Sequence, residues 1–160
     1  FGFIIGTLIF AILSIADRFS PSKVFFVCAM LGAVFNISIT WNGNTYESIL
    51  VFRFFTGFFL AGIYPVGMKI AADYYDKGLG KSLGYLVGAL VIGTALPHLL
   101  KDLKGSLPWE SVLIITSSLA FLGGILMRIF VPDGPHRKPS QKTDLKASKT
   151  SGSLVKIKPI

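Results

Sequence analysis

Apolar residues in this chain are gathered into five long stretches that short polar turns separate. A bilayer core about 30 Å thick needs roughly 20 helical residues at about 1.5 Å each. Four of the five stretches hold 18 to 24 residues with at most two charges. The pattern therefore predicts an all-α, polytopic bundle of transmembrane helices over residues 1–131. The five predicted spans are residues 1–16, 24–41, 49–72, 83–100 and 112–131.

Turn-forming residues mark the boundaries between these stretches. Ser-Pro-Ser at residues 20–22 separates the first two, Asn-Gly-Asn at 42–44 lies where the next turn is needed, and Pro-Asp-Gly-Pro at 132–135 ends the last. Beyond that point Lys, Ser, Thr and Pro dominate, and such a composition does not bury enough apolar surface to order itself. We therefore expect residues 132–160 to form a basic linker. For residues 154–160 the start of an interfacial helix is an alternative.

The composition excludes an ordinary soluble domain. Charged residues make up 15% of the chain, the apolar fraction is 52% and the mean hydropathy is +0.65, whereas globular proteins are roughly 25% charged. The single cysteine, Cys28, allows neither an internal disulfide nor a multi-cysteine zinc module. The first stretch begins at Phe1 with no basic region before it and no small-residue cleavage site after it. We therefore expect a fragment that has lost its start rather than a secretory signal.

The net charge of +8 is distributed in a way that indicates membrane topology rather than nucleic-acid binding. Residues 132–160 alone carry seven basic residues against two acidic ones. If successive turns alternate between the two faces of the membrane, one face carries Arg18, Lys23, Lys77, Lys81, Arg128, Arg137 and Lys138, and the other Lys101 and Lys104. The positive-inside rule then predicts an integral protein of the cell or inner membrane whose C-terminal tail is cytoplasmic.

Two charged residues lie inside the third stretch. Arg53 is about one turn from its start, and a charge at that depth is costly unless it snorkels, pairs or faces a wet cavity. At about 100° per residue, Gly57 and Tyr64 share its helical face. Two interpretations stay open: a cation that lines a solute or proton pathway, and an arginine that snorkels to the outer headgroups. For Lys69, a local ion pair with Asp73 one turn on is the simpler prediction.

The fourth stretch is rich in glycine. Gly80, Gly84 and Gly88 recur every four residues and are followed by Gly93 and Pro97. A stripe of small residues lets two helix backbones approach closely, which apolar helices in lipid require for association. We therefore expect helix packing at this stripe. A surface on which helices rock, with Pro97 as a weak point, is the alternative.

The pattern favours neither an enzyme nor a metal or cofactor site. Residues 80–84 spell Gly-x-Ser-x-Gly, but a hydrolase needs that motif on a strand-turn-helix with a histidine in reach. The two histidines, His98 and His136, lack the Glu-x-x-His and His-x-x-x-His spacings of metal ligands. We expect no catalysis and no cofactor.

Two short motifs lie in positions typical of one family. The run Ile-Ala-Asp-Arg that ends at Arg18, with Lys23 after it, lies in the turn between the first two predicted spans. It resembles the G-x-L-A-D-R-x-G-R-K signature that the major facilitator superfamily carries in a cytoplasmic turn. Arg53-Phe-Phe-Thr-Gly57 similarly resembles the R-x-x-x-G of that family's fourth helix.

A third motif lies at the inner end of the same span. Asp73, followed by Lys77 and Gly78, is similar to an acidic residue and an Arg-Gly pair in the family. On this resemblance the five spans are family helices two to six, and essentially the whole chain is covered, while the first helix and the second half are missing. The Gly-Pro dipeptide of the family's antiporter motif is absent from the fourth stretch, so the resemblance does not imply proton or drug antiport.

The resemblance implies part of a secondary active transporter that moves a small solute by alternating access between two halves. It also implies a charge cluster on the cytoplasmic face that holds the outward-facing state shut. Asp17 and Arg18 would be the core of this latch, Asp73 its partner, and Lys23 or Lys77 an added base. The alternative is that these charges only fix the orientation of the loops.

For Arg53, with Gly57 and Tyr64, the resemblance implies a role in proton coupling or in organising the solute cavity. No carboxylate lies within the five spans, so a counter-ion would come from missing helices, an anionic solute or lipid headgroups. The implied partners are membrane lipid, a small-molecule solute and the missing remainder of the transporter. A second hypothesis is a non-transporting membrane scaffold that binds partner helices through its glycine stripe.

Overall fold

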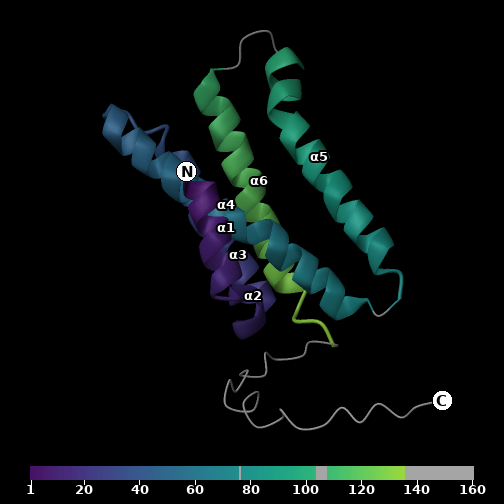
Figure 1. Ribbon diagram of the computed structural model, residues 1–160. Coiled ribbons are helices and arrows are strands. Elements are labelled where there is room, and N and C mark those ends of the chain that lie inside the picture. The colour runs from purple at the N-terminus through teal and green to yellow at the C-terminus, as the bar shows by residue number, and fades with distance from the viewer. Residues whose placement is uncertain (76, 104–107, 136–160) are drawn as a thin grey trace, which may run out of the picture.

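The computed structural model describes residues 1–75, 77–103 and 108–135, and within these ranges every regular element is a helix (Figure 1). Four of the helices are long and apolar enough to cross a bilayer, which confirms the predicted all-α membrane bundle. The elements are α1 (Gly2–Ile12), α2 (Ile15–Arg18), α3 (Pro21–Ser38), α4 (Tyr46–Tyr74), α5 (Leu79–Leu103) and α6 (Trp109–Phe130). The candidate spans are α3, α4, α6 and the first 18 residues of α5.

The structure differs from the prediction at the first apolar stretch. Helix α1 ends at Ile12, four residues before the end of the predicted span. It ends because Ser14 adopts a left-handed conformation with φ 46°, and the four-residue helix α2 follows. Since the run from Leu13 to Ala16 contains no Gly, Pro or charge, composition gave no sign of this break.

Polar residues fix the ends of the long helices within a few positions of the prediction. Helix α3 begins with Pro21 at its first position and Ser20 as its N-cap, whose side chain accepts a bond from the Lys23 N–H. At the other end of α3 the Asn44 side chain donates to the carbonyl oxygens of Ser38 and Ile39, at 2.8 and 3.1 Å. These side chains satisfy backbone groups that a helix end otherwise leaves unpaired.

Helix α4 packs against both α1 and α3, and α3 also packs along α6. Small residues allow the closest approaches. A Cβ added at Gly6 of α1 would lie 2.6 Å from the carbonyl oxygen of Phe58 in α4, and one at Gly124 of α6 would lie 2.9 Å from the Cβ of Ala29 in α3. The sequence predicted close packing at the glycines of α5, but these contacts lie at other glycines.

Helix α5 forms one edge of the bundle (Figure 1). None of its described side chains is buried, and a Cβ added at Gly80, Gly84, Gly88 or Gly93 would meet no atom within 4 Å in the described part of the chain. The side chain of Pro97 lies outside the described residues. The predicted packing stripe is therefore an open face of this bundle.

The helices alternate in direction, so successive turns lie at opposite ends (Figure 1). One end, called here the Asp17 end, carries α2, the first turn of α3, the last turn of α4, the first turn of α5 and the residues that follow α6. The turn between α3 and α4, which contains Gly43 with φ 112°, lies at the other end. The basic linker predicted for residues 136–160 lies outside the described residues, as does the interfacial helix considered for its end.

Candidate functional site

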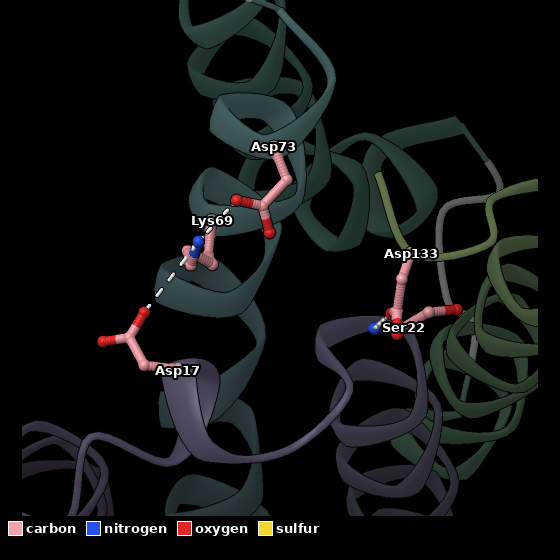
Figure 2. Close-up of polar contacts among 5 residues, drawn as sticks. All are labelled: Asp17, Ser22, Lys69, Asp73 and Asp133. Atoms are coloured by element: carbon pink, nitrogen blue, oxygen red, sulfur yellow. Dashed lines mark hydrogen bonds and ion pairs between the residues drawn. The ribbon is translucent and has the colours of Figure 1, made fainter. Parts of the chain in front are cut away.

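Three charged side chains meet at the Asp17 end, and Lys69 lies between the other two (Figure 2). Its Nζ donates to Asp73 Oδ1, one turn later on α4, and lies 3.9 Å from Asp17 Oδ1 on α2. The predicted local pair of Lys69 and Asp73 is confirmed. The three residues are called the Asp17 cluster below.

Burial is uneven across this cluster. The Asp73 side chain is only 5% exposed, whereas those of Lys69 and Asp17 are 24% and 49% exposed. The second oxygen of Asp73, Oδ2, is buried and has no hydrogen-bond partner among the residues that the structure describes. A buried carboxylate is costly without a charged partner, so the contact with Lys69 stabilises Asp73 in this position.

The sequence grouped Asp17 and Asp73 with Arg18, Lys23 and Lys77, but not with Lys69. Arg18, Lys23 and Lys77 are exposed at the same end, and none of them forms an ion pair with another described residue. The base that joins the two acids is therefore Lys69, because α2 lies beside the last turns of α4. The i, i+4 spacing signalled only the local half of this contact.

A second set of contacts at the Asp17 end joins the residues after α6 to α3. Asp133 Oδ1 accepts a hydrogen bond from Ser20 Oγ at 2.8 Å. It also accepts one from the Ser22 backbone N–H at 3.3 Å (Figure 2). Ser22 Oγ donates to the Val131 carbonyl at 2.8 Å. The sequence predicted Asp133 only as part of the turn that ends the last span.

Arg53 lies within α4, with its side chain toward α3. Its Nη1 donates to Asn36 Oδ1 at 3.4 Å, and Asn36 Nδ2 donates to Ser117 Oγ of α6 at 2.9 Å. Ser117 is buried, so the amide of Asn36 is held with its oxygen toward the arginine. Sequence reasoning missed Asn36 and Ser117, because single neutral polar residues in an apolar span carry no spacing signal.

A cavity of about 400 Å³ adjoins this network between α3, α4 and α6. Arg53, Asn36 and Ser117 line it, with apolar groups such as Leu60. Gly57, predicted on the same face as Arg53, instead packs on α1, where an added Cβ would lie 3.1 Å from the Phe3 backbone nitrogen.

Helical geometry explains this separation. Four residues turn a helix by about 400°, so Gly57 is rotated about 40° from Arg53. Because α4 packs against both α1 and α3, this rotation is enough for Gly57 to face α1 while Arg53 faces α3. Tyr64 is half-buried and is not among the residues that line the cavity. Of the three predicted residues, Arg53 alone is among those that line this cavity.

Comparison with known families decides how these features are interpreted. The family model described as Major Facilitator Superfamily matches residues 1–160. The chain belongs to the major facilitator superfamily. No curated protein and no solved structure matches it in the two other comparisons.

Membership of the major facilitator superfamily makes the chain part of a family of membrane transporters. Together with the four apolar helices, it identifies an integral membrane protein. The exposed apolar side chains fit this environment, since Leu122 is 56% exposed and Ile129 66%, and lipid rather than water covers such surfaces in a membrane.

Proposed function

We propose that the chain is part of a secondary active transporter that moves a small solute by alternating access, with the Asp17 end in the cytoplasm. The observation that carries the proposal is Lys69 held between Asp17 and the buried Asp73. This ion pairing joins α2 to the last turns of α4, so it opposes their separation. A charged contact between two elements at one end of a bundle is suited to closing that end in one state and opening it in another.

The orientation is supported by the distribution of basic residues. Arg18, Lys23, Lys77, Lys81 and Arg128 all lie at the Asp17 end. The positive-inside rule places that end in the cytoplasm, so the Asp17 cluster would close the inner side of the transporter in its outward-facing state.

Asp17→Asn in the full-length transporter is expected to favour the inward-open state. The substitution keeps the side-chain size but removes the charge that attracts Lys69. Transport should fall about threefold or more, and cytoplasmic thiol reagents should label the inner end faster, because an interaction worth about 1 kcal/mol shifts a two-state equilibrium by about fivefold.

Glu47→Gln is the matched control, since Glu47 is exposed in the first turn of α4 at the opposite end. It should leave both readouts unchanged. Unchanged transport and unchanged labelling in Asp17→Asn would refute the latch.

We further propose that Arg53 acts on the solute or on a coupling carboxylate. Its hydrogen-bond partner, Asn36, is neutral, so the guanidinium keeps its positive charge toward the cavity of about 400 Å³. A cation inside a membrane favours an anion nearby. An anionic solute is therefore the first class to test.

Arg53→Ala is expected to lower the uptake of the transported solute at least about tenfold, because a charge-assisted hydrogen bond contributes about 1.5–3 kcal/mol. Arg128→Ala is the matched control, because it makes the same substitution at an exposed arginine in the last turn of α6. It should transport within about twofold of the parent protein. Normal uptake by Arg53→Ala in a protein of normal abundance would exclude this role.

The open glycine face of α5 supports one further part of the proposal. A Cβ added at Gly80, Gly84, Gly88 or Gly93 would meet no described atom within 4 Å, yet such a face suits close helix contact. We assign it to packing against transmembrane helices of the transporter other than those described. A scaffold that binds partner helices would use the same face, but it would not require a lysine paired with the buried Asp73.

A further inference from the structure

The segment that follows α6 is held by the ends of two other helices. The Tyr74 hydroxyl, in the last turn of α4, donates to the Pro132 carbonyl at 2.6 Å. On the other side, Ser22 Oγ of α3 donates to the Val131 carbonyl at 2.8 Å. Ser22 is only 1% exposed, so this bond is shielded from water and holds its geometry. The backbone of residues 131–132 therefore joins α3 to α4.

The next residue, Asp133, fixes the start of α3. Its Oδ1 accepts from Ser20 Oγ and from the Ser22 N–H, and Ser20 is the N-cap of α3. A carboxylate at a helix N-terminus satisfies N–H groups that lack a partner within the helix, and it interacts favourably with the helix dipole. Asp133 thus supplements the cap that Ser20 provides.

The start of α3 determines where Asp17 lies. Helix α2 ends at Arg18, so Phe19 alone separates α2 from the N-cap Ser20. A chain this short transmits the position of Ser20 directly to α2.

Gly134, which follows Asp133, lies against the α4 part of the Asp17 cluster. Gly134 lies so close to α4 that an added Cβ would be 2.5 Å from the Asp73 carbonyl oxygen and 2.8 Å from the Asp73 Cβ. Residues 131–134 therefore contact both the end of α4, which carries Asp73, and the start of α3, which follows α2. Figure 2 shows Asp133 and Ser22 on the same end as Asp17, Lys69 and Asp73.

We propose that Asp133 is a positioning residue of the Asp17 cluster. By accepting bonds from Ser20 and Ser22 while its own segment rests on α4, it sets the separation at which Asp17 shares Lys69 with Asp73. This inference rests on the proposed function in one respect, that the cluster controls the inner end. A change in the segment after α6 would then alter the inner closure without touching any of the three charged residues.

The test uses the full-length transporter with Cys28 replaced by Ala and spin labels on cysteines at Phe19 and Tyr75. Both positions are exposed, at 60% and 51%, and they flank the cluster on the α2 and α4 sides. Asp133→Ala removes the acceptor, whereas Asp133→Asn keeps an oxygen that accepts the same bonds. Thr45→Ala is the matched control, because Thr45 caps α4 at the opposite end by accepting from the Ser48 N–H.

Asp133→Ala is expected to broaden the measured distance distribution and shift it to longer separations, and transport measured without the labels should fall roughly fivefold, the size of effect that loss of a helix cap produces. Asp133→Asn should keep the parent distribution and transport within about twofold, and Thr45→Ala should leave the distribution unchanged. In the double variant with Asp17→Asn, Asp133→Ala should cause little further loss of transport, because the two changes act on one contact.

An unchanged distance distribution in Asp133→Ala would overturn the positioning role, even if the variant were less stable. An equal change of the distance distribution in Thr45→Ala would overturn it as well, because the effect would then come from loss of helix capping in general. A changed distribution combined with normal transport in Asp17→Asn would instead leave the positioning role standing and refute the latch, so the two failures are distinguishable.

Discussion

Lys69→Met is expected to give the largest loss of function in this chain. Methionine preserves much of the apolar stem but removes the only charge that pairs with Asp73 among the described residues. Because the Asp73 side chain is 5% exposed, its carboxylate would be left buried and unpaired. Removing one partner of a buried pair costs about 3–5 kcal/mol, so both the thermal midpoint in detergent and the transport rate should fall, the latter at least about tenfold.

Two further variants make this result specific. Lys77→Met applies the same change to an exposed lysine at the same end, which forms no ion pair with any other described residue, and should leave both quantities near the parent values. Asp73→Asn added to Lys69→Met removes the unpaired charge and should recover most of the thermal stability. If Lys69→Met alone retained parent stability and transport, Lys69 could not be the residue that holds the two acids.

Gly6→Leu is the second large effect, and it acts on packing rather than on charge. A Cβ at residue 6 would already lie 2.6 Å from the Phe58 carbonyl oxygen and 3.0 Å from the Ala61 Cβ. The larger side chain would force α1 away from α4, and overpacking typically costs about 1–3 kcal/mol, occasionally more. The thermal midpoint of the purified full-length protein should fall by several degrees or more, with a matching loss of folded protein in the membrane.

Gly123→Leu provides the control, because a Cβ at Gly123 of α6 would meet no described atom within 4 Å. It introduces the same side chain into a helix of the same bundle and should change the midpoint little. Equal midpoints for Gly6→Leu and the parent protein would show that α1 and α4 are not packed through this glycine.

The long helices were predictable because lipid imposes a simple requirement on composition. A helix that crosses a bilayer needs a long run of apolar residues, so the absence of charge located α3, α4, α5 and α6 to within a few residues. The break at Ser14 was not predictable in this way, since a left-handed residue inside an apolar run depends on where α1 and α2 pack. Glycine contacts posed the same difficulty, because the regular stripe of α5 is open while the isolated Gly6 is in close contact.

The candidate site was predictable only where its contacts are local. The pair of Lys69 and Asp73 follows from helical spacing, whereas the approach of Asp17 to Lys69 depends on the position of α2 beside α4. The contact of Asp133 with Ser20 spans more than a hundred residues of sequence, and no motif connects them. Arg53 was identified from the sequence as a charge within a span. Its contact with Asn36 depends on how α3 packs against α4, which the sequence does not indicate.

The most direct test of the account is a flux measurement on the reconstituted full-length transporter with a panel of small solutes that includes anions. For an alternating-access transporter we expect uptake of at least one solute that saturates with concentration and is accelerated by unlabelled solute on the opposite side of the membrane, with both properties diminished in Arg53→Ala. Uptake no greater than that of empty vesicles for every solute, or uptake that rises linearly without exchange, would contradict it.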